Sequence, residues 1–225
     1  MNGYDIIFTF KKSKDRASAL IKKISSKSHS NKIDSFQLDL NNLGSIRKFF
    51  DTISNRNNIN VLVNNAAYTK NISNEEILKL SDADIIKIVN SNISGTFLFI
   101  TQFIDKIAIN SNDNFNIINI GSNSTKTLNA SNLLYMASKA AIENFTKSFA
   151  KIYGNRVRVN CVSPGLMYSN ITKRSPDLRF KMVIDKTPLE RLCGPNDISD
   201  AVFSIINEMK FMNGEIITID GGRSI

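Results

Sequence analysis

Short apolar runs alternate along this chain with longer segments of helical periodicity, and this alternation constrains the fold more than any other feature. Strands that alternate with helices are typical of a parallel sheet whose strands are joined by crossover helices. The pattern therefore predicts an α/β fold in a single domain that spans residues 1–225. The expected strands are Ile6–Phe10, Ser35–Leu38, Asn60–Val63, Asn116–Ile120, Arg156–Val162 and Glu215–Ile219, and the expected helices are 14–27, 44–56, 82–109, 135–153 and 196–209.

The composition excludes several other classes of protein. With 42% hydrophobic residues, the 225-residue chain can bury a sizeable core. It has no run of about 18 apolar residues and does not open with a secretory leader, so we expect neither a membrane span nor export. Two cysteines (Cys161 and Cys193) and one histidine (His29) are too few for a disulfide scaffold or a zinc site, and no metal site is expected. We therefore expect a cytoplasmic protein.

The positive charge is concentrated at the start of the chain. The net charge is +9, and residues 1–33 contribute +6 of it through eight cations and two anions. Such a basic region could attract an anionic cofactor, an acidic carrier protein or nucleic acid, although a solvated helix face explains it as well. No aromatic residues lie among these lysines, so we expect no nucleic-acid partner.

Polar or turn-forming residues follow each predicted strand directly. In open parallel sheets, ligands bind beyond the carboxyl ends of the strands, so these residues are expected to line one edge of the sheet as a candidate site. They are Lys11, Lys12, Asp39, Asn64, Asn65, Gly121, Ser122, Ser163, Pro164, Gly165, Asp220, Gly221 and Gly222.

A tyrosine and a lysine lie four residues apart on the predicted helix 135–153. This spacing places Tyr135 and Lys139 on one face, one helical turn apart. An ammonium group beside a phenol favours the phenolate, so we expect the pKa of Tyr135 to fall well below its ordinary value of about 10. A phenol tuned in this way is a usable general acid or base near neutral pH. Such a pair also arises by chance on half-exposed helices.

Two further polar residues accompany this pair. Ser122 follows the predicted strand Asn116–Ile120 and precedes Tyr135 by 13 residues. Asn92 lies in the middle of a predicted helix, where asparagine is a poor helix former, and Gly95 follows it closely. An Asn and a Gly inside a helix indicate a kink or a functional polar group.

Together these residues resemble the classical short-chain dehydrogenase/reductase family. A single motif of this family is weak evidence, but an ordered set that runs from Gly3 nearly to the C-terminus is specific. The resemblance implies a Rossmann-like, doubly wound parallel sheet and an NAD(P)-dependent oxidoreductase most similar to 3-oxoacyl-[acyl-carrier-protein] reductases. The motifs are LDL at 38–40, NNAA at 64–67, SNISG at 91–95, NIGS at 119–122, YMASK at 135–139, SPG at 163–165, PLERLCGP at 188–195 and the terminal NGEIITIDGG.

The resemblance implies catalytic roles for four residues. Tyr135 would donate a proton to the substrate carbonyl oxygen, and Lys139 would lower the pKa of Tyr135 and hold the nicotinamide ribose. Ser122 would hydrogen-bond the same carbonyl, and Asn92 would hold a water that relays protons to Lys139. Hydride transfer itself belongs to the cofactor.

The resemblance also implies cofactor contacts. Asp39 would contact the adenine, with Leu40 beside it as a further cofactor-binding residue, and Asn65 would contact the adenosine ribose. Met167 and Ser169 would lie at the nicotinamide carboxamide and the phosphates. Tyr135 and Lys139 would contact the nicotinamide ribose in addition to their catalytic roles.

The residues after the first predicted strand favour NADP over NAD. Relatives that prefer NAD carry an Asp at the end of this strand, where Phe10 stands here, and Lys11 and Lys12 follow directly. A 2′-phosphate would therefore gain two cationic partners and meet no acidic repulsion. Both lysines could instead be solvated surface residues.

One part of the family pattern is missing from this sequence. The family opens with a strand and a TGxxxGIG-like turn into a helix, where backbone amides bind the pyrophosphate of the cofactor. Here the resemblance starts at the end of that helix, so the first strand and first helix of the family are absent. Because that strand is central, we expect the sheet to be interrupted between Ile6–Phe10 and Asn60–Val63.

Three explanations for the missing segment stay open. The true start of the protein lies upstream, or the chain is a shortened and catalytically silent relative, or it is a shortened, folded protein that acts as a binding or scaffold subunit. Retention of Ser122, Tyr135, Lys139 and Asn92 favours the first explanation. We expect residues 1–225 to bind NADP(H) weakly or not at all.

The substrate is left open by the sequence. A small-molecule or acyl-thioester carbonyl compound is expected, and the resemblance points to fatty acid biosynthesis. Asn116 and Lys173 stand where carrier-protein reductases tend to have arginines, and the segment Ser169–Lys186, a lid or a short helical excursion, has no readable chemistry. Family members usually form dimers or tetramers, and the apolar stripes Ile85–Ile107 and Ile142–Phe149 are compatible with such an assembly or with burial in the core.

Overall fold

The computed structural model describes residues 3–26, 31–56, 59–72, 74–109, 111, 113–130, 132–167 and 177–225. All six expected strands are present, and their ends differ from the expected ones by no more than two residues. The expected α/β fold with parallel strands is confirmed. The strands are β1 (Ile6–Phe10), β2 (Ile33–Gln37), β3 (Val61–Asn64), β4 (Phe115–Ile120), β5 (Val157–Pro164) and β6 (Ile216–Ile219).

The expected helices are also present, and the segment 82–109 is distorted as its sequence indicated. Each of its α-helices is followed by a π-helical turn, and Asn92 lies in the first of these turns. Helix α7 occupies part of the segment 169–186, whose first residues, with Ser169 and Lys173, lie outside the described residues. The helical elements are α1 (Lys14–Ser25), α2 (Leu43–Ile53), η1 (Asn74–Lys79), α3 (Asp82–Ile88), η2 (Val89–Ser94), α4 (Gly95–Phe103), η3 (Ile104–Ala108), α5 (Ser124–Thr127), α6 (Leu133–Tyr153), α7 (Asp177–Asp185) and α8 (Pro195–Asn207).

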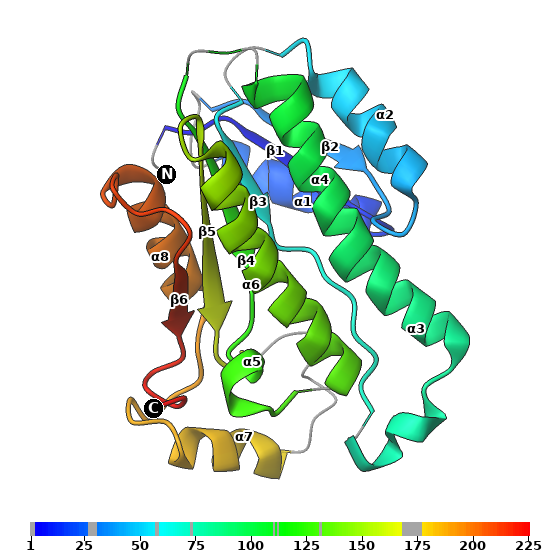
Figure 1. Cartoon of the computed structure of the whole chain (residues 1–225), viewed down its shortest axis with the longest axis vertical. Coiled ribbons are helices and arrows are strands. Elements are labelled where there is room, and N and C mark those ends of the chain that lie inside the picture. The colour runs from blue at the N-terminus through cyan, green and yellow to red at the C-terminus, as the bar shows by residue number, and fades with distance from the viewer. Residues whose placement is uncertain are drawn as a thin grey trace.

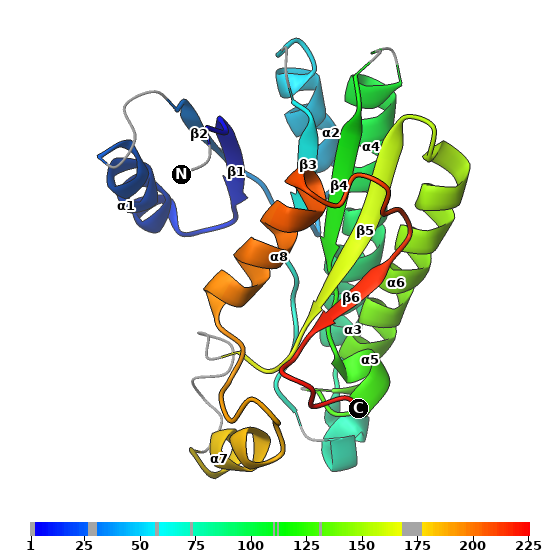
Figure 2. The same cartoon turned by 90° about the vertical axis from the view of Figure 1, so that its left-hand side faces the viewer.

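The sheet is interrupted between β1 and β3. Strands β1 and β2 form a two-stranded parallel sheet, and β3, β4, β5 and β6 form a separate four-stranded sheet in that order. Within the described part of the chain, no strand pairs with the second edge of β1 or with the outer edge of β3. This break lies where the sequence predicted the loss of a central strand. Figure 2 shows β1 and β2 to one side of the four-stranded sheet.

Helices lie on both faces of the four-stranded sheet, which is therefore doubly wound. Helices α2, α4 and α6 lie on one face and α8 on the other (Figures 1 and 2). The larger hydrophobic core lies on the first face and includes Phe50, Phe103 and Ile117. The smaller core lies beneath α8 and includes Val162 and Ile205.

Aromatic packing attaches the two-stranded sheet to the rest of the fold. The ring of Phe36, in β2, lies 5.5 Å from that of Phe49 in α2, measured between centroids. Phe49 and Phe50 continue this contact to Phe99 of α4, at 5.6 and 4.9 Å. Such edge-on and tilted pairs add to the free energy of burying the rings. Aromatic packing on α2 therefore helps to hold β1 and β2, which no strand of the described ranges joins to β3.

The strands beside the interruption are less buried than central strands of a parallel sheet usually are. Ile6 in β1 is 36% exposed and Val63 in β3 is 43% exposed, whereas all six residues of β4 are buried. The backbone amides of β4 are shielded by a strand on each side, whereas among the described residues those of β1 and β3 are shielded by a strand on one side only.

The apolar stripes of the long helices are divided between core and surface. Ile142 and Phe149 are buried, whereas Ile86 and Phe97 are exposed. The stripes thus contribute to the core in part and leave some apolar surface on the outer helices. In the described part of the chain, none of the helices combines the length and apolarity needed to cross a membrane.

We expect amide hydrogen exchange to report the interruption directly. Amides of β1 and β3 should exchange at least about tenfold faster than those of β4 and β5, because one edge of each has no strand paired with it in the part of the chain that the structure describes. Exchange followed by mass spectrometry at peptide resolution measures this difference. Equal protection of all four strands would contradict the interrupted sheet.

Candidate active site

Ser122 lies in the turn that follows β4, at the carboxyl edge of the four-stranded sheet. Its hydroxyl oxygen accepts a hydrogen bond from the backbone N–H of Ser124 at 3.2 Å. The hydroxyl hydrogen can therefore point elsewhere, and Ser122 also forms a hydrogen bond with the side chain of Tyr135. Strand β4 and helix α6 thus bring Ser122 and Tyr135 together, as the sequence predicted.

Tyr135 and Lys139 lie in the first turns of α6. Helix α6 begins after Asn132, whose side-chain oxygen accepts a hydrogen bond from the backbone N–H of Tyr135 at 2.8 Å and caps the helix. Lys139 is only 5% exposed, and its Nζ donates to the backbone carbonyl of Ile120, the last residue of β4, at 2.7 Å. The same Nζ lies 5.7 Å from the centre of the Tyr135 ring.

The protonation of this pair differs from the sequence-based expectation. Burial raises the pKa of Tyr135 to about 12, and the hydrogen bond with Ser122 only partly offsets that effect. Burial also lowers the pKa of Lys139 to about 8, so its charge is costly to maintain. The expectation that Lys139 would bring the pKa of Tyr135 well below 10 is therefore wrong for the protein without cofactor. The physical reason is that burial of the phenol outweighs the influence of a lysine bound to Ile120.

Asn92 lies in the π-helical turn η2 and is 2% exposed. Its side-chain oxygen accepts a hydrogen bond from the backbone N–H of Tyr68 at 2.8 Å, and its amide nitrogen donates to the carbonyl of Tyr68 at 2.9 Å. The amide nitrogen also donates to Ser138 of α6 at 3.0 Å. Asn92 therefore ties the segment after β3 to α6, beside the Tyr135–Lys139 turn.

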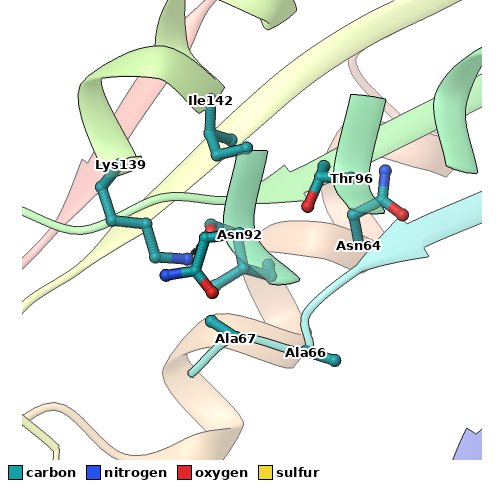
Figure 3. Close-up of a pocket in the computed structure, with 8 residues that line it drawn as sticks. Asn64, Ala66, Ala67, Asn92, Thr96, Lys139 and Ile142 are labelled. Carbon is teal, nitrogen blue, oxygen red and sulfur yellow. Dashed lines mark hydrogen bonds between the residues drawn. The ribbon is translucent and has the colours of Figure 1, made fainter. Parts of the chain in front are cut away.

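A small cavity of about 10 Å³ lies next to these residues. Figure 3 shows Lys139 and Asn92 extending toward one another, with Ala66 and Ala67 beside them. A volume of this size holds about one water molecule, and the polar side chains around it could bind one. The lining residues are Asn64, Ala66, Ala67, Asn92, Thr96, Ile120, Lys139 and Ile142.

A series of buried hydrogen bonds stiffens the wall behind the site. Asn64, at the end of β3, donates to the side chain of Asn119 in β4 at 2.9 Å. Asn119 donates in turn to Thr146 of α6 at 2.9 Å. The series thus joins β3, β4 and α6. Both amide side chains have hydrogen-bond partners within the fold, as buried polar groups require.

The residues predicted to bind the adenosine end of a cofactor lie on the loops after β1 and β2. The ammonium of Lys11 lies 2.7 Å from a carboxylate oxygen of Asp39, so the two predicted cofactor residues already pair with each other. Burial alone would raise the pKa of Asp39, but its bonds with Lys11 and Asn41 outweigh that effect and lower the pKa. Lys12 is exposed.

The loop after β2 also contacts the helical segment that carries Asn92. Asn41 donates to the hydroxyl of Ser91 at 3.2 Å. The carbonyl oxygen of Leu40 lies 2.7 Å from the position that a Cβ would take at Gly95, so a side chain at position 95 would clash with it. Gly95 thus permits the close approach between the predicted adenine-binding loop and η2.

The remaining predicted cofactor residues are placed as follows. Asn65 is exposed just after β3. Met167 is half-buried and forms an isolated parallel bridge with Cys193. Ser169 lies outside the described residues, as does His29.

The site fits the two ends of a nicotinamide dinucleotide better than its middle. The buried Lys139, with Tyr135 and Ser122, suits the nicotinamide ribose end, and the cations after β1 suit a phosphorylated adenosine end. A pyrophosphate is usually bound by a glycine-rich turn at a helix N-terminus. Among the described residues, the turn before α1 is Lys11–Ser13 and contains no glycine.

Several residues of the site were not singled out from the sequence. Ser138 and Asn132 are both fully buried and hold Asn92 and the start of α6 in place. The only sequence signal for Asn132 is its position three residues before Tyr135. The side chain of an N-cap residue bonds a backbone N–H two or three residues further on, and asparagine is favoured there. No group of three His, Cys, Asp or Glu that could hold a metal occurs among the described residues.

Comparison with known proteins identifies the family of the chain. A family model described as "Enoyl-(Acyl carrier protein) reductase" matches residues 1–224. A curated 3-oxoacyl-[acyl-carrier-protein] reductase of Aquifex aeolicus is 30% identical over 211 residues, which cover 92% of this chain and 83% of the relative. The corresponding reductase of Thermotoga maritima is 28% identical over 197 residues, 86% of this chain and 78% of the relative.

The chain belongs to the short-chain dehydrogenase/reductase family. It is thus an oxidoreductase of a family that uses NAD(P). A short-chain dehydrogenase from Burkholderia cenocepacia, solved in complex with NADP, superposes with a TM-score of 0.86 at 23% identity, covering 98% of this chain and 88% of the other. This likeness confirms the Rossmann-like fold. The short-chain dehydrogenase/reductase fold is therefore retained on both sides of the interruption in the sheet.

Replacement of Lys139 by methionine should stabilise this short-chain dehydrogenase/reductase at neutral pH. The folded protein binds the Lys139 proton less tightly than the unfolded chain, since the pKa falls from 10.5 to about 8. The cost of the buried charge is therefore present in full below pH 8 and fades as the pH rises toward 10.5. We expect Lys139→Met to raise the free energy of unfolding by about 1–3 kcal/mol at pH 7.

Urea unfolding at several pH values measures this effect. The difference between Lys139→Met and the wild type should shrink between pH 8 and pH 10.5. Lys147→Met, a change of an exposed lysine on the same helix, is the matched control and should show no such dependence. A difference that stays constant across this range would mean that Lys139 is not buried as a charged group.

Proposed function

We propose that the chain reduces a carbonyl compound to an alcohol with NADPH, as a 3-oxoacyl-thioester reductase or a close equivalent. The observation that carries the proposal is the convergence of Ser122, Tyr135 and Lys139 at the carboxyl end of β4. The relatives from Thermotoga maritima and Aquifex aeolicus are 3-oxoacyl-[acyl-carrier-protein] reductases, which supports the 3-oxoacyl substrate class and, with it, a place in fatty acid biosynthesis.

The proposed chemistry assigns proton transfer to Tyr135. NADPH, when bound, supplies the hydride. The substrate carbonyl oxygen accepts hydrogen bonds from the hydroxyls of Ser122 and Tyr135, which stabilise the charge that develops on it. Tyr135 then gives up its proton, and its phenolate is stabilised by Ser122 and the nearby ammonium of Lys139. A water in the cavity beside Asn92 and Lys139 would then relay a proton through Lys139 and restore the protonated form of Tyr135.

The pKa of Tyr135, about 12 without cofactor, suits an acid that must stay protonated until the substrate arrives. A phenol with so high a pKa donates its proton poorly near neutral pH. Protonated Lys139 is the group within the site that favours the phenolate, and its own pKa of about 8 keeps a substantial charged fraction at neutral pH. Proton transfer in this proposal therefore depends on the ammonium form of Lys139.

The preference for NADPH over NADH rests on the loop after β1. Lys11 and Lys12 would hold the 2′-phosphate, and Phe10 replaces the acidic residue that would repel it. Asp39 is both the partner of Lys11 and a predicted adenine contact, so the 2′-phosphate would compete with Asp39 for Lys11. The NADP in the Burkholderia cenocepacia structure supports this choice of cofactor.

A second function is favoured by the interrupted sheet. A chain without a pyrophosphate-binding turn in its described part, and with unpaired edges on β1 and β3, could serve as a binding or scaffold subunit without catalysis. Oxidation of NADPH with a generic β-ketoester distinguishes this function from the reductase.

We place the protein in the cytoplasm under either proposal. The exposed apolar surface on the outer helices supports a homodimer or homotetramer.

Tyr135→Phe should remove nearly all activity with a β-ketoester. Loss of a general acid typically costs 10²- to 10⁴-fold in rate, about 3–5 kcal/mol of transition-state stabilisation. The rate of NADPH oxidation is measured with millimolar NADPH to offset weak binding. Tyr153→Phe, on the same helix but stacked on Phe149, is the matched control and should keep wild-type turnover. Substantial turnover by Tyr135→Phe would reject this mechanism.

NADPH should bind to residues 1–225 more weakly than micromolar, because the described part of this chain contains no glycine-rich turn to bind the pyrophosphate. Titration of NADPH fluorescence measures the dissociation constant, and NADH measured in parallel should bind more weakly still. The double variant Lys11→Ala with Lys12→Ala should bring the two affinities within about twofold of each other. Lys22→Ala with Lys23→Ala, on α1, is the control. Micromolar or tighter NADPH binding by the wild type would contradict the predicted defect.

A further inference from the structure

Asn123 directly follows Ser122 and stands at the N-cap position of α5. Asparagine is among the preferred N-cap residues because its side chain usually accepts a hydrogen bond from the helix. Within the described part of the chain, Asn123 forms no such bond, and the Ser122 hydroxyl accepts the N–H of Ser124 instead. The side chain of Asn123 is thus available for another partner.

That partner is Asp220, which lies 97 residues further along the chain. The amide nitrogen of Asn123 donates to a carboxylate oxygen of Asp220 at 3.0 Å. Asn123 is 5% exposed and Asp220 is 9% exposed, so both polar groups are removed from water. A buried carboxylate is costly unless hydrogen bonds satisfy it, which makes the pair a specific feature rather than a surface contact.

Asp220 follows β6 directly and is itself held in place. Its second carboxylate oxygen accepts the N–H of Gly222 at 3.1 Å. Burial alone would raise the pKa of Asp220, but the hydrogen bonds from Asn123, Ser224 and Gly222 outweigh it and keep the pKa below its ordinary value. The carboxylate therefore stays ionised and fully engaged at neutral pH.

The end of β5 completes the junction. The backbone N–H of Asn123 donates to the carbonyl of Pro164 at 2.9 Å, and the N–H of Gly165 donates to Ile219 in β6 at 2.9 Å. A Cβ at Gly165 would lie 2.9 Å from the Cβ of Asp220, so only glycine permits this approach. Backbone and side-chain bonds thus fix the turn after β4 to the ends of both β5 and β6.

We propose that Asn123 and Asp220 are positioning residues through which the C-terminal strand holds Ser122 at the reacting carbonyl. The inference rests on the proposed function for its catalytic consequence, and on the hydrogen bonds above for its geometry. Ser122 is one residue from Asn123, so any rotation of the Asn123 backbone moves the hydroxyl that faces Tyr135. A displacement of about 1 Å in a catalytic group can cost about 10²-fold in rate.

A reciprocal exchange tests the pair. Asn123→Asp places two carboxylates against each other, and Asp220→Asn replaces the charged acceptor with an amide, so each single variant weakens the link. The double variant Asn123→Asp with Asp220→Asn restores an amide facing a carboxylate. We expect each single variant to lower kcat by about tenfold or more, with KM for NADPH within about twofold of the wild type, and the double variant to recover most of the loss.

Two further measurements do not depend on turnover. Melting temperatures should fall in both single variants and recover in the double variant. Crystal structures should show the Ser122 hydroxyl displaced from Tyr135 in the single variants and returned in the double variant. Lys126→Met is the matched control, because it removes another contact between α5 and β6, with Thr218 at 2.8 Å, and should leave kcat unchanged.

The outcomes separate this inference from the proposed function. Single variants that melt earlier but keep wild-type kcat and an unmoved Ser122 would overturn the positioning role. Failure of the double variant to recover melting temperature, Ser122 position and kcat would overturn the pairing. A wild type without any turnover would reject the proposed function alone, since the position of Ser122 and the melting temperatures would still decide the role of the pair.

Discussion

Pairing of β4 with a strand on each side is the constraint on which the candidate site depends. The carbonyl oxygen of Ile120, the last residue of β4, accepts a hydrogen bond from the buried ammonium of Lys139. The turn that follows β4 carries Ser122. Because β3 and β5 fix β4 along its length, these two groups meet Tyr135 without any contribution from β1 or β2. The interruption of the sheet lies on the far side of β3 and leaves this arrangement intact.

The sequence predicted the elements of the fold well because their signals are local. Each strand is a short apolar run, and the strands that pair on both sides, β4 and β5, are the ones whose runs are most continuously buried. The Tyr135–Lys139 spacing likewise predicts a shared helix face from backbone geometry alone. The distortion around Asn92 was predicted only as a kink or a functional group, because the partners of its side chain, Tyr68 and Ser138, lie elsewhere in the chain.

Interactions between distant residues could not be predicted in the same way. The pKa of Tyr135 was misjudged because spacing reports the nearness of Lys139 but not the burial of the phenol, which has the larger effect. Asn123 and Asp220 are each ordinary residues for a turn, and only the fold shows that they face each other. Lys11 was predicted to bind a phosphate, but its pairing with Asp39 requires the register of β1 and β2.

The interruption divides binding from chemistry within one site. The cations proposed to hold the adenosine end follow β1 of the two-stranded sheet, and the groups proposed to transfer protons lie on α6 and in the turn after β4, beside the four-stranded sheet. Contact of Leu40 with Gly95, the bond between Asn41 and Ser91, and the phenylalanine cluster on α2 link the two parts. Ser122, Tyr135 and Lys139 are held by the turn after β4 and by α6, through bonds such as that from Lys139 to the carbonyl of Ile120. These interactions are made within the protein and involve no group of a dinucleotide.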